Sequence, residues 1–400
     1  MQAGSCQAAC YSQPELFGPK DPVIIRKSGS DPEFPSTKGG GRGEGAERRH
    51  RAGMRQIGFA FHYDSWYNQI SQRKSNETYF LKGVFIMAYE KRKVILTVAQ
   101  TGNFQGKAQN PNLPEQPAEI IQSAYDCYNA GASIVHVHAR DKNGKSCNDG
   151  EIFAEINSGI RAKCGTHGII IQNSSAPATR DNAQTDDGLG VLDMKDPTCW
   201  PEMCSLDCSL MTTTWGDLEF IYMWTRKWLI KTAQRIKDMG IKAEIEVFDP
   251  TAIEDVFKYL YPAGVLDDPV SLTLVMGMDK VSQGAISCTR QNIDFMYDLC
   301  LSSAAAAGVK KPIDVTTMAI GANQLHGTVY GMLRGTGIRT GMEDNINYSY
   351  HQPAESNAQL VERIVRIIHE LDMEVATPDE ARDVLGLARL KGTDRVRGNI

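Results

Sequence analysis

The chain has 400 residues, of which 42% are hydrophobic and 23% charged, as is typical of a globular protein with a large core. Its net charge of −5 gives no basic surface of the kind that binds nucleic acid. No apolar run reaches the ~18 residues of a membrane span, and the N-terminus lacks the pattern of a secretory signal. The ten cysteines show no dense spacing, which favours reduced thiols over a disulfide framework. We therefore expect a cytoplasmic protein with no nucleic-acid or membrane partner.

The first 86 residues differ in composition from the rest. Residues 38–53 are rich in Gly and Arg without any period, and residues 57–86 are more aromatic but equally aperiodic. Such a segment buries too little apolar surface to offset its chain entropy. We predict that residues 1–86 are a largely irregular extension, that the folded domain starts at Met87, and that residues 393–400 are a short tail.

From Val94 onward, short β-rich runs alternate with longer segments of helical period. The longer segments include residues 117–131, 221–240 and 290–308, and each ends in a glycine of the kind that terminates helices. The β-rich runs predict eight strands, at residues 94–99, 133–138, 168–173, 203–208, 243–248, 270–277, 313–320 and 337–342.

Eight βα units in about 300 residues favour a closed barrel over an open doubly wound sheet. A dinucleotide-binding fold loses its main support, because no GxGxxG motif follows the first strand. The predicted fold class is therefore α/β, a (β/α)8 TIM barrel over residues 87–392.

The second expected strand contains two histidines, in the stretch IVHVHARD. Alternate strand residues share a face, so His136 and His138 point the same way, about 7 Å apart. Taken alone, this pattern more often marks two strand histidines with ordinary polar neighbours. In a barrel a functional role becomes the better interpretation, because the active site of a barrel forms where the strands end and His136 and His138 lie at such an end.

Polar residues gather at those strand ends, and a single shared site explains them together. Without one, each buried polar group that lacks a partner costs about 1–3 kcal/mol. The candidates are Thr101, Arg140, Asp141, Ser174, Ser175, Ser205, Asp207, Glu244, Glu246, Arg339, Glu343 and Asp344.

The histidine pair predicts a divalent metal site. Two neutral imidazoles need at least one carboxylate, and two His with one Glu is a familiar catalytic zinc arrangement. Glu246 and Glu343 are both candidates for the third ligand, and the pattern does not choose between them. Glu244 is expected to be either a second acid of the pocket or part of a salt bridge inside the barrel. Asp207 is expected either to line the pocket or to form a hydrogen bond with a loop.

Several motifs in order resemble those of the β-keto acid cleavage enzymes, over roughly residues 91–392. They are ILTVAQTG with NPNLP, GASIVHVHARD, IIIQNSS, PEMCSLD, EIEVF, IRTGMEDN, and AESNAQLVERIVRI with ATPDEAR. The resemblance implies a zinc ion bound by His136, His138 and Glu343. It also implies acetyl-CoA as co-substrate and a homo-oligomer of four subunits.

The resemblance implies roles for four further residues. Asp344 removes a proton from the substrate, and a positive Arg339 orients Asp344 and keeps it ionised. Ser174 and Ser205 match hydroxyl positions that hold substrate and assist transfer. In the implied reaction zinc polarises the ketone of a β-keto acid, and the deprotonated CH2 carbon attacks the thioester of acetyl-CoA. Transfer of CoA and a retro-Claisen cleavage then yield acetoacetate and a new acyl-CoA.

The substrate pocket departs from the family pattern at one position. Glu246 matches a carboxylate that faces the ammonium group in the family member that cleaves 3-keto-5-aminohexanoate. That enzyme has TGAE where this chain has TGNF, so a second carboxylate is replaced by Phe104. A cationic substrate would lose much of its electrostatic support. We predict that the recognised side group is neutral, apolar or anionic, with Thr101 and Ser175 as further substrate-binding candidates.

Three other functions compete with this hypothesis. A metal-dependent hydrolase on the same barrel would gather more histidines from later strands, and the last five expected strands contain none. A metal-dependent aldolase or lyase would differ in not using CoA. A non-catalytic barrel that binds acyl-CoA would be expected to lose the base, whereas Asp344 and Arg339 are both present.

Overall fold

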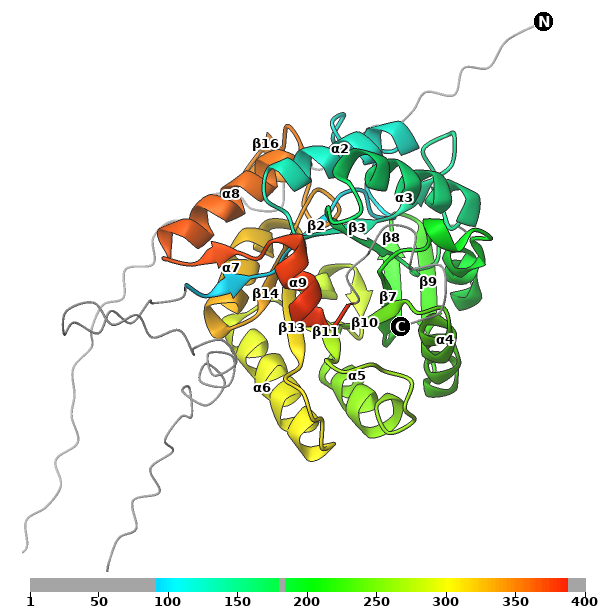
Figure 1. The fold of residues 1–400 in the computed structure, drawn as a ribbon, viewed down its shortest axis with the longest axis vertical. Helices are drawn as coiled ribbons and strands as arrows, with labels where there is room; N and C mark the ends of the chain where they lie inside the picture. Colours follow the sequence, from blue (N-terminus) through cyan, green and yellow to red (C-terminus); the bar gives the residue numbers. More distant parts are fainter. Residues whose placement is uncertain (1–90, 180–183, 388–400) are drawn as a thin grey trace, which may run out of the picture. The chain divides into compact units, whose positions relative to one another are not determined.

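The computed structural model describes residues 91–179 and 184–387. Within these ranges, eight parallel strands close into a barrel in the order β10-β11-β13-β14-β2-β3-β6-β7 (Figure 1). The predicted TIM barrel is therefore confirmed. The predicted extension 1–86 and tail 393–400 lie outside the described residues.

Each of the eight predicted strands corresponds to one strand of the barrel. The barrel strands are β2 (Leu96–Ala99), β3 (Ile134–Val137), β6 (Ile170–Asn173), β7 (Met203–Cys208), β10 (Lys242–Val247), β11 (Ser271–Met276), β13 (Asp314–Ala319) and β14 (Gly337–Thr340). Short strands outside the barrel are β1 (Lys93–Val94), β4 (Ala139–Arg140), β5 (Ser146–Cys147), β8 (Leu210–Trp215), β9 (Leu218–Met223), β12 (Ser282–Gln283), β15 (Asn347–Ser349), β16 (Gln352–Pro353) and β17 (Glu374–Val375).

The helices pack around the outside of the barrel (Figure 1). They are α2 (Pro117–Asn129), α3 (Gly150–Cys164), α4 (Arg226–Asp238), α5 (Pro250–Asp255), α6 (Arg290–Ala306), α7 (Gln324–Arg334), α8 (Asn357–Glu370) and α9 (Pro378–Leu385). Further helical segments of the 3-10 type are η1 (Thr185–Asp193), η2 (Pro197–Cys199), η4 (Met278–Lys280) and η5 (Gly321–Asn323), and η3 (Val256–Leu260) is a π-helical segment. None of the helices in the described ranges is long and apolar enough to cross a membrane.

Local signals explain where several of these helices begin and end. The side chains of Thr225 and Thr289 accept backbone hydrogen bonds at the starts of α4 and α6. The glycines predicted to follow α2, α4 and α6 all have positive φ, which only glycine adopts without strain: Gly131, Gly240 and Gly308.

One helix begins later in the chain than the sequence predicts. The segment 221–240 was expected to be helical throughout, but its first residues belong to β9, and α4 begins only at Arg226. The chain reverses between β8 and β9 at Gly216, which has φ +62°, and Thr212 pairs with Ile221 across the hairpin. Alternating β-branched and aromatic residues at 220–222 suit this hairpin better than a helix.

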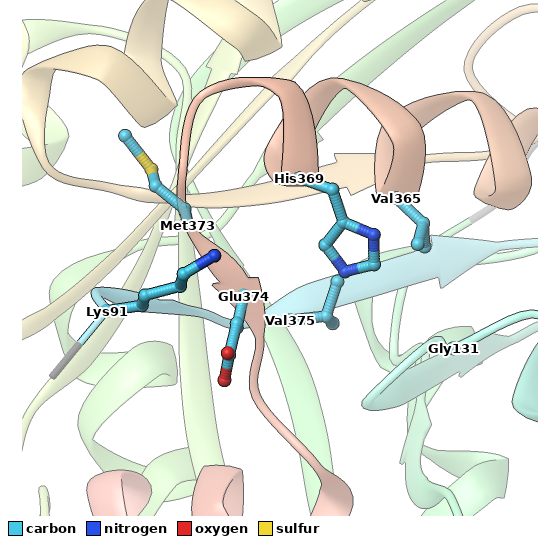
Figure 2. Close-up of a pocket in the computed structure, with 7 residues that line it drawn as sticks. All are labelled: Lys91, Gly131, Val365, His369, Met373, Glu374 and Val375. Atoms are coloured by element: carbon cyan, nitrogen blue, oxygen red, sulfur yellow. The ribbon is translucent and has the colours of Figure 1, made fainter.

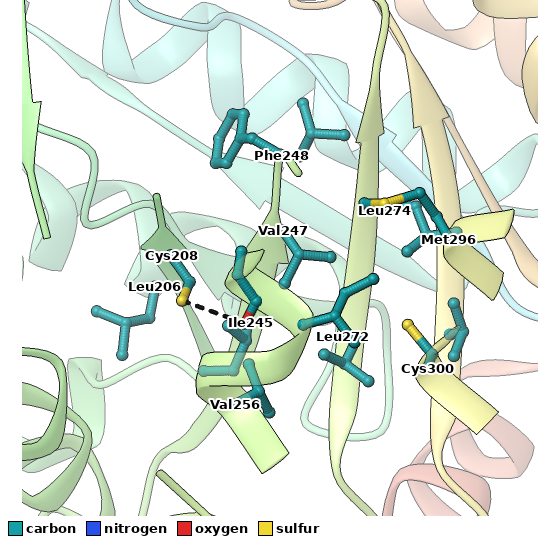
Figure 3. Close-up of a cluster of buried hydrophobic side chains, with 14 of the residues drawn as sticks. Leu206, Cys208, Ile245, Val247, Phe248, Val256, Leu272, Leu274, Met296 and Cys300 are labelled. Atoms are coloured by element: carbon teal, nitrogen blue, oxygen red, sulfur yellow. Dashed lines mark hydrogen bonds between the residues drawn. The ribbon is translucent and has the colours of Figure 1, made fainter. Parts of the chain in front are cut away.

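The apolar core lies between the barrel and its helices. Outward-facing strand residues pack against α6 and the segment after α5, as Figure 3 shows for Leu206, Ile245, Val247, Leu272, Val256, Met296 and Cys300. The alternate residues of the same strands therefore face the barrel interior. Where the strands end, this interior is lined by buried polar residues, among them His136, Asp207 and Glu246.

A final helix closes the end of the barrel where the strands begin, and Figure 1 shows α9 across this opening. Thr377 and Glu380 form a capping box at its start. Its apolar residues Ala381 and Leu385 join the inward-facing strand residues Ile95, Ile134, Ile170 and Met203 in one cluster. The opposite end, which holds the polar strand ends, carries the candidate site.

Candidate active site

The two histidines of β3 meet a glutamate that comes from the loop after β14. The Nε2 atoms of His136 and His138 lie 3.6 and 3.4 Å from Oε1 of Glu343. One ligand atom from each residue lies within 4.8 Å of the others, which is compatible with a single metal ion. Oε2 of Glu343 is buried and has no hydrogen-bond partner among the described residues. The donor set and this unsatisfied oxygen both fit a divalent cation.

The protonation states of these side chains also suit a metal. Burial lowers the pKa of His136 to about 3, so its imidazole is neutral, as a ligand must be. Burial opposes the ionisation of Glu343, but His138 and Arg339 outweigh it and hold the pKa of Glu343 well below its usual range. His136 therefore offers a neutral imidazole and Glu343 offers a carboxylate.

Glu343 reaches the histidines because the backbone beside it belongs to Gly102. This glycine has φ +67°, and a Cβ at its position would lie 2.6 Å from Cγ of Glu343. Any larger residue would therefore have to displace the Glu343 side chain. Gly102 is thus needed for the close approach of the two loops that follow the neighbouring strands β2 and β14.

Arg339 of β14 joins three carboxylates beside the histidines. It donates to both oxygens of Asp344, at 3.1 and 3.0 Å, and to Oε1 of Glu343 at 2.6 Å. Its remaining terminal nitrogen donates to Glu246 at 3.1 Å. The structure therefore places Glu343 at the histidines and Glu246 against the guanidinium, so Glu246 is not the third member of the histidine group.

The ionisation of Asp344 differs from the expectation that Arg339 simply keeps it charged. Burial raises the pKa of Asp344 to about 7, and although Arg339 opposes this, Glu343 adds to it. The bidentate contact with Arg339 still fixes the orientation of the carboxylate. A general base with a pKa near neutrality is well suited to take and release a proton.

Two residues left open by the sequence are now placed. Glu244 forms no salt bridge among the described contacts, and its carboxyl group accepts hydrogen bonds from Gln172 and Thr273. Burial and the nearby Glu246 raise its pKa to about 8. Burial, with Glu246 and Glu244 nearby, also raises the pKa of Asp207 well above its usual value. Both residues line the barrel interior rather than a surface loop.

The four predicted hydroxyl groups fall into two pairs. The hydroxyl of Thr101 donates to the carbonyl of Pro114, and that of Ser175 donates to the carbonyl of Ser205. These two donors already have backbone partners. Oγ of Ser174 accepts from the backbone of Ala176 and keeps its proton to donate, while Oγ of Ser205 is buried without a partner among the described residues. Ser174 and Ser205 are thus the better placed donors.

Phe104 forms an aromatic contact that the sequence did not indicate. Its ring centroid lies 5.3 Å from that of Trp215, the last residue of β8, with the rings tilted by 51°. Gln105 beside it donates to the backbone of Glu343 at 3.4 Å. Sequence reasoning missed Trp215 because the β8–β9 hairpin is an insertion between two barrel strands. No strand-end pattern therefore pointed to it.

A pocket elsewhere on the domain contains none of the residues of the histidine group. It has a volume of about 480 Å³ and lies near β1, β17 and the end of α8 (Figure 2). Its lining residues are Lys91, Gly131, Val365, His369, Met373, Glu374 and Val375. Because this pocket lacks the histidines and carboxylates described above, the residues at the strand ends remain the candidate active site.

Comparisons with known proteins cover this whole domain. A family model described as beta-keto acid cleavage enzyme matches residues 93–387. The chain is 32% identical, over 74% of its length and 99% of the relative's, to the 3-keto-5-aminohexanoate cleavage enzyme of Acetoanaerobium sticklandii. It is 29% identical, over 74% and 96% of the two chains, to the 3-oxoadipate:acetyl-CoA acetyltransferase of Cupriavidus necator. A solved ternary complex of ObcA with a C4-CoA adduct and oxalate matches in fold, with a TM-score of 0.55, 16% identity and coverage of 69% and 68%.

Proposed function

Because this chain belongs to the β-keto acid cleavage enzyme family, we propose that it converts a β-keto acid and acetyl-CoA into acetoacetate and a new acyl-CoA. The observation that supports this proposal best is the position of the Asp344–Arg339 pair beside His136, His138 and Glu343. A base is needed to remove a proton next to a ketone, and a metal ion beside that base makes the proton easier to remove by polarising the ketone.

We assign zinc to His136, His138 and Glu343, since two imidazoles and one carboxylate are typical ligands of catalytic zinc. A zinc ion there would act as a Lewis acid on the ketone and carboxylate oxygens of the substrate. Asp344 would take the proton from the CH2 between these groups while Arg339 holds its carboxylate in place. The hydroxyls of Ser174 and Ser205 would donate hydrogen bonds to the oxyanions that form during acyl transfer.

The side group of the substrate is proposed to be neutral, apolar or anionic. Phe104 stands where the aminohexanoate-type pattern has a glutamate, and it contacts Trp215 rather than any charged group. The two residues best placed to compensate are occupied, since Glu246 pairs with Arg339 and Gln105 contacts the backbone of Glu343. An ammonium group would therefore meet aromatic carbon where it needs a carboxylate.

The decisive experiment measures acetoacetate release from acetyl-CoA with a panel of β-keto acids whose side groups are cationic, neutral or anionic. Each reaction is run with and without a chelator, and metal content is measured in the same preparation. Turnover of a non-cationic acid that the chelator abolishes is the expected result. Absence of turnover across the panel in zinc-loaded protein would contradict the proposal and favour a CoA-independent aldolase.

We also propose a homo-tetramer, as the family resemblance implies, and a cytoplasmic location, as the spacing of the cysteines favours. Light scattering coupled to size-exclusion chromatography measures the mass of the assembly directly, and a mass close to four times 44.1 kDa is expected.

A further inference from the structure

We propose that Gln172 and Asn103 are positioning residues of the metal centre, each fixing one ligand histidine in the tautomer that binds metal. This inference rests on the proposed function in one respect: it takes the two histidines as metal ligands. An imidazole can bind a metal through Nε2 only if its proton resides on Nδ1. What the Nδ1 atoms contact therefore decides whether the Nε2 atoms are available to the metal.

Gln172 controls the first histidine from the neighbouring strand. The two residues are directly paired in the β3–β6 ladder, and Oε1 of Gln172 lies 2.8 Å from Nδ1 of His136. Nε2 of Gln172 donates to Oε2 of Glu244 at 3.1 Å, and Glu244 also accepts from Thr273. With its nitrogen directed at Glu244, Gln172 presents its oxygen to His136. A carbonyl oxygen only accepts, so the Nδ1 atom must donate.

Asn103 controls the second histidine from the loop after β2. Its Oδ1 lies 2.9 Å from Nδ1 of His138 and also accepts from the hydroxyl of Ser146 at 2.5 Å. Its Nδ2 donates to the carbonyl of Pro177 at 3.1 Å. These contacts, one with Ser146 of β5 and one with the backbone of Pro177, define which end of the amide faces the imidazole. His138 is thereby held with its proton on Nδ1.

The test compares zinc affinity among variants of the full chain, measured by competition with a chromophoric chelator and without any substrate. Gln172→Leu and Asn103→Leu remove the acceptors at similar volume, and each is expected to weaken zinc binding about 10- to 100-fold. Asn103→Asp keeps an acceptor oxygen and should stay close to the unmodified chain. The visible absorption spectrum of the cobalt-loaded protein should change in the two leucine variants alone.

A control variant separates this role from the general loss of a buried amide. Asn157 of α3 is buried and bonds to Asn173 and to the backbone of Cys199, with no contact to either histidine. Asn157→Leu should lower the melting temperature of the metal-free protein without changing its zinc affinity. Circular dichroism of every metal-free variant confirms that it is folded.

Unchanged zinc affinity in both leucine variants would overturn the inference. So would an equal loss of affinity in Asn103→Asp or in Asn157→Leu, because the acceptor atom would then not be the cause. Turnover of β-keto acids is measured on the same samples. If the affinities follow the expected pattern but the zinc-loaded chain has no turnover, the positioning role stands and the proposed reaction fails.

Discussion

At the scale of single residues, we propose that Phe104 determines which charge the substrate pocket tolerates. We predict that Phe104→Glu shifts specificity toward 3-keto-5-aminohexanoate relative to a neutral β-keto acid of the same length. The shift in the kcat/KM ratio should be on the order of tenfold, which corresponds to about 1.4 kcal/mol. Direct competition between the two acids, with acetyl-CoA present, measures it.

Phe104→Gln is the matched control for this change, because it opens the aromatic contact with Trp215 without adding a charge. It should leave the ratio near that of the unmodified chain. An equal shift in both variants would mean that pocket volume, and not charge, selects the substrate.

Asp344 is the residue whose loss should separate chemistry from metal binding. Asp344→Asn keeps the shape of the side chain but removes the base, so kcat should fall about 10²- to 10⁴-fold. Zinc content should not change, because the ligand group comprises His136, His138 and Glu343. Metal analysis of the purified variant beside its kcat makes the comparison. A parallel loss of zinc would instead indicate that Asp344 supports the metal group.

At the scale of secondary-structure elements, the site depends on how closely the ends of β2 and β14 approach each other. Gly102→Ala should displace Glu343, because the added Cβ would lie 2.6 Å from its Cγ. We expect weaker zinc binding and at least a tenfold loss of kcat/KM, measured with the panel substrate that is turned over best.

The hairpin between β8 and β9 provides the control for Gly102. Gly216 also has positive φ, at +62°, but nothing lies within 4 Å of a Cβ placed there. Gly216→Ala should therefore lower stability by about 1 kcal/mol through backbone strain alone and leave zinc affinity intact. An equal loss of zinc affinity in the two variants would show that backbone strain, and not displacement of Glu343, weakens zinc binding.

At the scale of the whole molecule, α9 seals the barrel through a buried ion pair. Arg382 donates to Glu202 through Nε and Nη2 at 2.7 and 2.9 Å, and both side chains are almost fully buried. Arg382→Leu would leave the Glu202 charge buried and unpaired, so we expect a loss of about 3–5 kcal/mol in the free energy of unfolding. The midpoint of urea unfolding measures it.

The double variant Arg382→Leu with Glu202→Leu should recover most of that loss, since no uncompensated charge remains. Lys258→Ala, which removes an exposed salt bridge to Glu254, should change stability by less than about 1 kcal/mol. If the double variant were less stable than Arg382→Leu alone, the ion pair would stabilise the fold by more than the neutralisation of its two charges.

The barrel is also expected to function without the first 86 residues. The family match covers residues 93–387, and the described barrel with α9 lies within residues 91–387. We predict that a chain beginning at Met87 keeps the turnover of the full chain, measured with the same panel. An insoluble or inactive product would show that the preceding segment contributes to folding or to the site.

Much of the architecture was predictable because its signals are local. A buried parallel strand needs a short run of β-branched residues, and a covering helix needs a 3.6-residue period with caps, so eight strands and several helix ends follow from neighbouring residues. The segment 221–240 shows where such signals are insufficient. Ile221 and Tyr222 fit a helical period as well as a strand, and only pairing with Thr212 and Met211 across the hairpin selects the strand.

The sequence by itself determined the histidine pair, because the spacing of two residues on a strand places His136 and His138 on one face. Its family resemblance then named Glu343, Arg339 and Asp344. The tertiary structure then placed Glu343 against the histidines, and it alone showed that Glu246 pairs with Arg339. It also decided that Gln172 and Asn103 stand behind the imidazoles. Closing the barrel brings β14 beside β2, and thus joins residues more than 200 positions apart. Contacts of that kind depend on the register of the closed sheet, which no local pattern encodes.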